Sequence, residues 1–211
     1  MVLLSTAYWP NIHYFFYVLN ADRIVIEQHE HYQKQSFRNR TSILSANGKL
    51  DLVIPVNHKQ DKQKISEVEI SYKEAWQIRH WRAITSAYKN SPYFEFFEDE
   101  LKVFYFKEHE LLLDYNLLQL RTILKILKIK KEIELTENYE DKLLDYPDLR
   151  NIIHPKVNIA EDQKISRFVN RPYYQTFENK FGFTPNLSIL DLLFNQGLQT
   201  LDYFPKVTLT L

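Results

Sequence analysis

Apolar runs alternate with polar segments from the start of the chain. Residues 2–8 are typical of a buried strand, residues 11–20 of an aromatic helix, and residues 23–27 of a second strand. A strand, a helix and a strand in this order predict a βαβ unit whose two strands run parallel through a right-handed crossover. Because parallel sheets bind ligands at the carboxyl ends of their strands, we expect Tyr8 and the segment 28–40 to lie close together.

A hairpin is predicted directly after that segment. Asn47-Gly48, a dipeptide that favours the tight turns of hairpins, separates residues 40–44 from residues 50–54. We expect the second of these strands to join the sheet of the βαβ unit. Residues 68–72 alternate between apolar and polar positions and predict one further strand.

Helical spacing dominates from about residue 75 onward. Residues 75–89 carry one stripe of core side chains, among them Trp76. A second predicted helix places leucines on one face at Leu113, Leu117, Leu120, Leu124 and Leu127. Both stripes indicate helices packed against a core.

A further helix is predicted within residues 183–197. Ser188 and Asp191 stand at the spacing of a capping box, and Gly197 provides the usual stop. Both polar residues are therefore interpreted as caps rather than as catalytic groups.

The remaining pattern completes the predicted fold. Within the charged, proline-punctuated interval 131–170, irregular turns are predicted at Tyr146-Pro147 and His154-Pro155. Residues 207–211 predict a last edge strand. The predicted class is α/β in a single domain of residues 1–211. An N-terminal βαβ unit and hairpin form a mixed sheet over about residues 1–75, followed by a mostly helical part over about 76–204.

Composition narrows the class of protein. The 211 residues suffice for one domain with a substantial core, and an aromatic content of 15% suits a well-packed interior. The formal net charge of +0 gives no overall attraction to nucleic acid, so we expect no nucleic-acid partner. The 3 glycines are far apart, which excludes the glycine-rich loops that cradle phosphates. The absence of cysteine excludes disulfides and thiolate catalysis.

The chain is expected to be cytoplasmic and to lack a membrane span. Its first residues form a short apolar run without the basic lead of a signal peptide, and no later stretch is apolar enough to cross a bilayer. The lack of cysteine agrees with a reducing compartment. Nothing in the pattern specifies a cofactor or an oligomeric state.

The densest collection of chemically active side chains lies within residues 28–40. Arg38 and Arg40 are two residues apart. On an extended segment they would face the same way as Lys34 and Tyr32. Guanidinium groups bind phosphate and carboxylate well, so these side chains are candidates for holding an anionic ligand. A solvated cationic rim would account for the same pattern.

Three further residues are ligand-binding candidates. Tyr8 belongs to them through its position at the end of the first predicted strand. Asn39 points away from the arginines on an extended segment, where hydrogen bonding to the backbone is the alternative role. Arg82 lies on the helix of residues 75–89 and is expected to reach toward an acidic group.

His29, Tyr32 and His80 are the candidates for moving a proton in catalysis. A histidine base needs a pKa near neutrality, which burial and neighbouring charges decide. His80 shares its helical stripe with Trp76, so a hydrogen-bonded core histidine is the alternative interpretation.

Alternating residues suggest a weaker metal-binding possibility. Glu27, His29 and His31 are each two residues apart and could ligate zinc from one face of a strand. Polar surface histidines explain so short a pattern more simply, so no metal site is predicted.

A set of short motifs runs in order along most of the chain. It comprises Tyr8-x-Pro10, Ala21-Asp22, Tyr32-x-Lys34, Asn39-Arg40, Ile54-Pro55-Val56, His80-Trp81-Arg82, Ala87-Tyr88, Pro92-Tyr93-Phe94 and Leu187-Ser188-Ile189-Leu190-Asp191-Leu192-Leu193. This set resembles the WbqC-like protein family. The resemblance implies a link to bacterial O-antigen and surface-polysaccharide gene clusters, and for some members a glycine transferase role.

Two classes of function follow. The first is a transferase, in which Lys34, Arg38 and Arg40 hold the anionic group of an activated sugar or aminoacyl donor. His29 or Tyr32 would then move the proton. The second is a non-catalytic protein that binds a nucleotide, a sugar precursor or a partner protein. In both cases the expected small-molecule ligand is anionic or sugar-linked.

Overall fold

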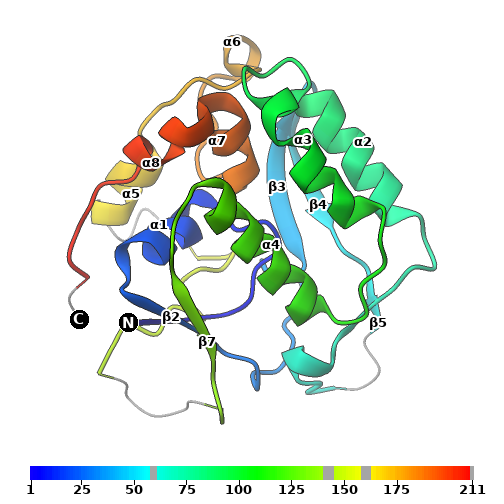
Figure 1. Ribbon diagram of the computed structural model, residues 1–211, viewed down its shortest axis with the longest axis vertical. Helices are drawn as coiled ribbons and strands as arrows, with labels where there is room; N and C mark the ends of the chain where they lie inside the picture. The colour runs from blue at the N-terminus through cyan, green and yellow to red at the C-terminus, as the bar shows by residue number, and fades with distance from the viewer. Residues whose placement is uncertain (58–60, 140–144, 158–162, 210–211) are drawn as a thin grey trace.

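The computed structural model describes residues 1–57, 61–139, 145–157 and 163–209 (Figure 1). One sheet has three parallel strands in the order β1-β2-β7, namely β1 (Val2–Leu4), β2 (Arg23–Ile26) and β7 (Glu132–Leu135). Helix α1 (Ile12–Asn20) connects β1 to β2, which confirms the predicted βαβ unit. The first strand ends before residue 8, because the chain leaves the sheet and the Tyr8 amide donates to the Phe37 carbonyl (3.0 Å).

The other strands form two antiparallel pairs outside this sheet. They are β3 (Arg40–Ser45), β4 (Gly48–Val53), β5 (Val56–Asn57) and β6 (Glu69–Ile70). The first pair is the predicted hairpin. The second pair contains part of the strand predicted over residues 68–72.

Helices make up most of the chain after these strands, as predicted. The α-helices are α2 (Trp76–Tyr88), α3 (Phe94–Lys102), α4 (Leu112–Ile126), α5 (Gln163–Val169), α6 (Glu178–Phe181), α7 (Ile189–Gln196) and α8 (Thr200–Tyr203), with short 3-10 helices at Ile65–Glu67, Val103–Tyr105 and Gly197–Gln199. The α/β class is therefore confirmed. The edge strand expected over 207–211 is absent from residues 207–209, and residues 210–211 lie outside the described part of the chain.

The parallel sheet is wider than the sequence predicts, because two segments of the interval 131–170 join it. β7 pairs with β2 on one side. On the other side Asp148 forms a parallel bridge with Leu3, whose amide donates to the Pro147 carbonyl at 2.9 Å. Tyr146 and His154-Pro155 lie in bends and turns as predicted, but the pairing of these two segments with the sheet was not predicted.

The hairpin does not join the parallel sheet, so the expectation that its second strand would do so is wrong. Ile43 and Leu44 of β3 are buried, and β3 packs against α2 and α7. The Ser188 amide donates to the Ser42 carbonyl at 2.8 Å and so occupies the other edge of β3. Contacts with the C-terminal helices thus replace pairing with the first strands.

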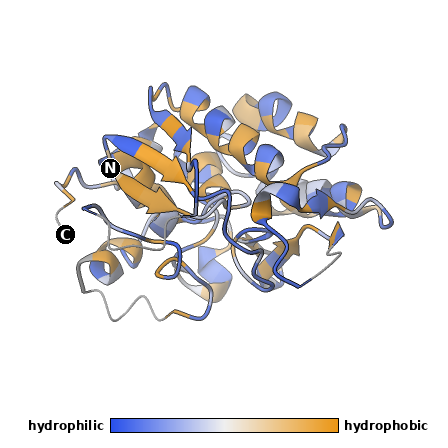
Figure 2. Ribbon diagram, turned by 90° about the horizontal axis from the view of Figure 1, so that it is seen from below, coloured by the Kyte–Doolittle hydropathy of each residue, from blue (hydrophilic) through white to orange (hydrophobic). Residues whose placement is uncertain are grey.

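Apolar residues concentrate on β1 and β2, whose ribbons are mostly orange in Figure 2. Five of their side chains are at most 1% exposed, namely Val2, Leu3, Leu4, Ile24 and Ile26. Such continuous apolar runs are expected of parallel strands that are covered on both faces.

Helix α7 begins later than residue 183, where the sequence predicted its start, but it has the predicted capping residue and the predicted stop. Ser188 caps it by accepting a hydrogen bond from the Leu190 amide, and Gly197 ends it with a φ of +57°. Loop residues precede it where the sequence predicted helix from residue 183.

Asp191 is not the capping residue that the sequence predicts. Its buried carboxylate accepts hydrogen bonds from the Tyr88 hydroxyl (2.8 Å), the Tyr173 hydroxyl (2.5 Å) and the Gln175 amide (3.1 Å). Burial raises the pKa of Asp191 to about 6, although the three donors oppose that rise. The carboxylate therefore connects α7 to α2 and to the segment before α6.

Replacing Gly197 with alanine is expected to destabilise the fold more than replacing Gly182. Both glycines have a left-handed φ, which costs another residue about 1–3 kcal/mol. A Cβ at Gly197 would also lie 2.6 Å from the Tyr93 ring, whereas one at Gly182 meets no atom within 4 Å. We expect Gly197→Ala to lose about 1–3 kcal/mol more unfolding free energy than Gly182→Ala in urea titrations. Equal losses would contradict the steric role of Tyr93.

Candidate ligand-binding site

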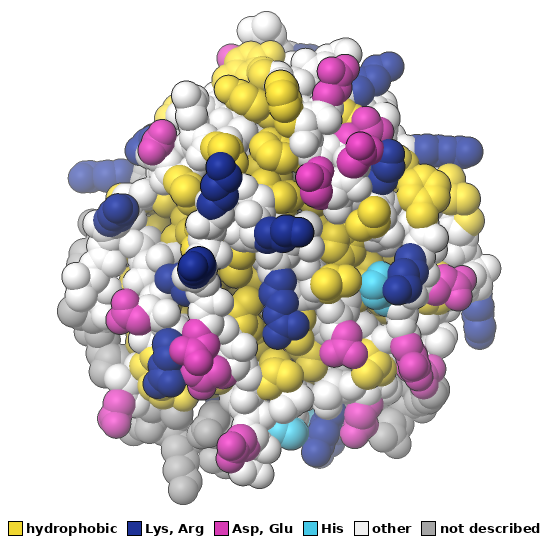
Figure 3. Space-filling view, viewed as in Figure 1, with side chains coloured by type: hydrophobic (Ala, Val, Ile, Leu, Met, Phe, Trp, Pro, Cys, Tyr) yellow, Lys and Arg dark blue, Asp and Glu magenta, His cyan; other side chains and the backbone are white. Residues whose placement is uncertain are grey.

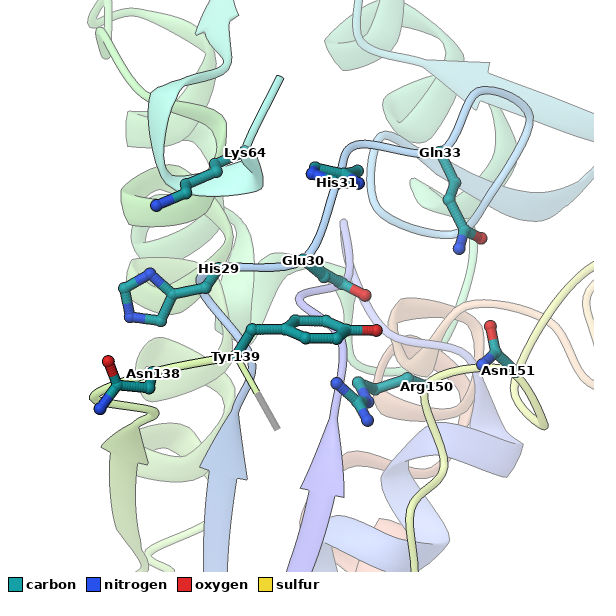
Figure 4. Close-up of a pocket in the computed structure, with 9 residues that line it drawn as sticks. All are labelled: His29, Glu30, His31, Gln33, Lys64, Asn138, Tyr139, Arg150 and Asn151. Atoms are coloured by element: carbon teal, nitrogen blue, oxygen red, sulfur yellow. The ribbon is translucent and has the colours of Figure 1, made fainter. Parts of the chain in front are cut away.

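A pocket of about 500 Å³ opens where the parallel strands end, and the arrowheads of these strands point toward it in Figure 4. Its lining residues are His29, Glu30, His31, Gln33, Lys64, Asn138, Tyr139, Arg150 and Asn151. We call it the sheet-edge pocket. Its volume is typical of sites for small molecules, and its position is where parallel sheets bind ligands.

Each wall of the pocket follows a segment of the sheet. Residues 27–33 come directly after β2, residues 136–139 after β7, and residues 150–151 after the segment that pairs with β1. Lys64 comes from a fourth segment, which forms an isolated bridge with His31. The pocket is thus a consequence of the sheet order.

Glu27 joins three of these segments. Its carboxylate is fully buried and accepts hydrogen bonds from the Thr136 hydroxyl (2.7 Å), the His29 amide (2.8 Å) and the Arg150 guanidinium (3.1 Å). A buried carboxylate is tolerated only when it is paired in this way. The ends of β2 and β7 and the segment beside β1 are therefore fixed relative to one another.

Arg150 forms a rigid wall of the pocket. Its Nε donates to Asp148 Oδ1 (2.9 Å), its Nη2 donates to Asp148 Oδ2 (2.6 Å), and its guanidinium lies 5.0 Å from the centroid of the Tyr139 ring. Burial lowers the pKa of Arg150 and raises that of Asp148, but their mutual hydrogen bonds outweigh burial in both cases. The net result is a raised pKa for Arg150 and a lowered pKa for Asp148, so both groups stay charged.

Arg38 belongs to a second buried ion pair. Its Nε donates to Glu30 Oε1 (2.8 Å), and its Nη2 donates to Glu30 Oε2 (2.5 Å) and to Ser5 Oγ (2.7 Å). Arg38 is only 2% exposed. The expectation that it faces a ligand is wrong, because its fork is occupied by Glu30.

His29 lines the pocket with a ring whose tautomer can be deduced. Its Nε2 lies 3.1 Å from the Thr136 carbonyl oxygen, which can only accept a hydrogen bond. In the neutral ring the proton therefore sits on Nε2, which leaves Nδ1 as an acceptor. In Figure 4 the ring lies on the same side of the pocket as Lys64 and Asn138.

The cationic face predicted for residues 32–40 does not form. Tyr32, Lys34 and Arg40 do not line the pocket. The segment turns instead of running extended, as the left-handed φ of +56° at Gln35 shows. Arg40 lies on β3 beside Asp51 (3.4 Å), and Lys34 is exposed. Burial raises the pKa of Tyr32 even though nearby arginines oppose the rise, which makes it a poor base.

Tyr8 and His80 lie in the core rather than in the pocket. Trp9 Nε1 donates to the Tyr105 hydroxyl (2.7 Å), which is 3.1 Å from the Tyr8 hydroxyl, which in turn is 2.9 Å from His80 Nδ1. Burial lowers the pKa of His80 to about 4, so the ring is neutral and accepts from Tyr8. The alternative interpretation of His80 as a hydrogen-bonded core histidine fits this geometry.

Asn39 and Arg82 also lie away from the pocket. The buried Asn39 amide donates to the Ile54 carbonyl at 2.8 Å, which is the backbone role given as the alternative. Arg82 is exposed on α2. Of the predicted catalytic and ligand-binding residues, His29 is the one found in the described lining of the pocket. His31, which was named only in the metal alternative, also lines it.

The residues of the metal alternative are not arranged around a common point. The Glu27 carboxylate is occupied by the donors described above, and His29 Nε2 faces the Thr136 carbonyl. Within the described ranges, no three histidine, aspartate or glutamate side chains are placed to hold a metal ion.

Sequence reasoning missed the residues that follow β7 and Asp148. Asn138 and Tyr139 lie just after Glu132–Leu135, whose short alternating pattern is the one signal that could have placed them. Arg150 and its neighbours gave no comparable signal, because a single parallel bridge positions them.

Comparison with known proteins identifies the family of this chain. The family model described as WbqC-like protein family matches residues 6–170. The chain belongs to the WbqC-like protein family. This WbqC-like protein is also similar to a Mycobacterium tuberculosis protein named Uncharacterized protein Rv1507c, with 27% identity over 223 residues that cover 96% of each chain. No solved structure matches it.

The helices give no indication of a membrane span. Within the described residues, none of them combines the length and the apolar character that crossing a bilayer requires.

Arg38 and Arg40 are expected to differ sharply in their contribution to stability. Arg38→Met leaves Glu30 buried without its cation, which should cost about 3–5 kcal/mol of unfolding free energy. Arg40→Met is the matched control, because its ion pair is long and partly exposed and should contribute less than about 1 kcal/mol. Urea titrations of both variants measure the difference. Similar losses would contradict the structural role of Arg38.

His80 and Asp191 are expected to oppose each other in the pH dependence of stability. The unfolded chain binds the extra proton of His80 between pH 6.5 and about 4, so this residue removes about 3 kcal/mol of stability as the pH falls. The folded protein binds the extra proton of Asp191 between about pH 6 and 3.8, so this residue adds about 3 kcal/mol over that fall.

Single variants separate the two contributions. Relative to the wild type, His80→Gln should gain stability as the pH falls through this window, and Asp191→Asn should lose it. Unfolding free energies measured at several pH values test both signs. Variant profiles that run parallel to the wild-type profile would show that neither group has a shifted pKa.

Proposed function

We propose that this WbqC-like protein is a transferase that acts on a sugar-linked, anionic substrate in the sheet-edge pocket. The observation that supports the proposal is the lining itself, in which two cations, a carboxylate, two imidazoles and several amides surround one hollow of about 500 Å³. Glycine or aminoacyl transfer to a sugar in bacterial O-antigen or surface-polysaccharide synthesis is the reaction that the family resemblance suggests.

Lys64 would hold the anionic group of the substrate. Arg150 is ion-paired with Asp148, and Glu30 is ion-paired with Arg38. Among the described lining residues, Lys64 is therefore the permanent cation without an ion-pair partner. One cation beside neutral groups matches a ligand that combines a phosphate or carboxylate with uncharged polar parts.

The neutral lining would bind the sugar part. Gln33, Asn138 and Asn151 each provide an amide that can both donate and accept hydrogen bonds, which suits hydroxyl groups. In Figure 4 the Tyr139 ring extends between the loop of residues 29–33 and Arg150. The cation over this ring orients it as an apolar surface within the polar lining.

His29 would act as the general base. Its Nδ1 is the acceptor atom of the neutral ring and could take the proton from an attacking hydroxyl or amine. The Thr136 carbonyl would hold the neutral ring in this tautomer before the proton moves, and would accept from the same Nε2–H of the imidazolium that forms. The substrate oxygen or nitrogen then forms the bond to the transferred group, and the leaving group departs with the electron pair of the broken bond.

A non-catalytic binding protein is the second candidate. It is favoured by the state of the two glutamates near His29, because Glu27 and Glu30 are both engaged by arginines. Neither carboxylate is available to complete a second acid–base group. Such a protein would use the same pocket to hold a sugar precursor without converting it.

Binding and turnover with uridine-diphosphate sugars distinguish these functions. Lys64→Ala should weaken binding at least about ten-fold in calorimetry, because a charged hydrogen bond is lost. Lys34→Ala, an exposed lysine outside the pocket, is the matched control and should bind as the wild type does. His29→Ala should retain most of the affinity but lose about 10²–10⁴-fold in turnover with an aminoacyl co-substrate.

The outcomes test separately whether the pocket is the binding site and whether the protein catalyses a reaction. Binding that is weakened by Lys64→Ala, with no turnover in the wild type, would favour the non-catalytic protein. Binding that is weakened equally by Lys34→Ala, or by neither variant, would overturn the assignment of the pocket.

A further inference from the structure

A cluster of cations lies at the other end of β7 from the sheet-edge pocket. Arg121, Lys125, Lys128 and Lys130 are all exposed where α4 ends and the chain turns into β7. Arg121 and Lys125 are four residues apart on α4 and share one face of it, whereas Lys128 and Lys130 follow the end of the helix at Ile126. Figure 3 shows Lys and Arg side chains gathered in the middle of this face, over α4. We call these four residues the basic patch.

Fold stability does not account for the basic patch. The ion pairs within the described ranges include none of its four cations. The negative end of the α4 dipole favours cations at Lys125 and Lys128, but Arg121 lies further back and Lys130 lies beyond the helix. Neighbouring Lys131, by contrast, has a structural role, because its ammonium donates to backbone carbonyls at the end of α1.

The basic patch surrounds a shallow apolar hollow. The hollow has a volume of about 780 Å³ and is lined by the patch together with Leu124, Ile129 and Ile133. Both isoleucines are half-buried, and Glu132 is the acidic residue among the described lining residues. No aromatic ring is part of this described lining.

We propose that the basic patch docks this protein on an anionic lipid bilayer. Phosphate headgroups complement the four cations, and the adjoining acyl chains complement the isoleucines between them. Duplex DNA offers phosphates but no apolar surface for the hollow. Single strands are usually bound by stacking on aromatic side chains, which this lining lacks.

Docking at this face leaves the sheet-edge pocket accessible. The two features are joined by β7, and the eight residues from Lys131 to Asn138 span roughly 20 Å when extended. A protein held through the basic patch would therefore keep the pocket away from the headgroups. Membrane docking does not depend on the proposed function, and either can fail alone.

Vesicle sedimentation tests the docking proposal. The full chain should bind vesicles of phosphatidylcholine mixed with phosphatidylglycerol, and should not bind phosphatidylcholine alone. The double variant Lys125→Ala, Lys128→Ala should partition about 25-fold more weakly, because each cation near a charged bilayer contributes about five-fold. Lys89→Ala is the matched control, since Lys89 is also an exposed lysine at a helix end. Raising the salt concentration should weaken binding of the wild type.

Each remaining outcome would overturn the proposal. These outcomes are equal binding to both kinds of vesicle, an unchanged double variant, or an equal loss in Lys89→Ala. Tighter binding to duplex or single-stranded DNA at the same salt would identify the patch as a nucleic-acid surface. Release from vesicles by inorganic phosphate at constant ionic strength would identify a site for free phosphate. Circular dichroism and thermal unfolding verify that the variants are folded.

Discussion

The Glu27 carboxylate is the interaction on which the geometry of the sheet-edge pocket depends. It is fully buried directly after β2, and its donors come from the ends of three chain segments. Two of these segments lie more than a hundred residues away in sequence. Because each donor neutralises part of the cost of burying the charge, the three strand ends are held in one arrangement. The walls of the pocket are thus positioned before any ligand binds.

Polar groups are buried elsewhere in the protein by the same rule. Glu30 is satisfied by Arg38 and Ser5, and Asp191 by two tyrosine hydroxyls and an amide. These networks join segments that apolar packing alone would allow to slide, since hydrogen-bond donors and acceptors have direction. Asp191 forms no ion pair within the described ranges, and burial raises its pKa, whereas Asp148 pairs with Arg150 and has a lowered pKa.

Local signals in the sequence were sufficient for much of the fold. The βαβ unit, the Asn47-Gly48 hairpin and the cap and stop residues of α7 follow from periodicity and from turn and cap residues. Long-range pairing was not predictable in this way. β7 is short and follows a lysine-rich run, and a single bridge places Asp148 beside β1. The hairpin was assigned to the wrong sheet because its buried strand packs on distant helices rather than on β1 or β2.

The candidate site shows why counting charges in a segment misleads. Residues 28–40 form a turning segment, and part of its charge serves to fix that turn through the ion pair between Glu30 and Arg38. Glu30 and Ser5 occupy the Nε and Nη2 donors of Arg38, Nη1 lies 3.4 Å from Gln33 Oε1, and the side chain is only 2% exposed. The groups able to meet a ligand are those that the turn does not consume. In this segment His29 and His31 both line the pocket, and the Thr136 carbonyl assigns the tautomer of His29, whose Nδ1 is left as an acceptor. Function is therefore better sought in what the buried network leaves unpaired than in where charges are densest.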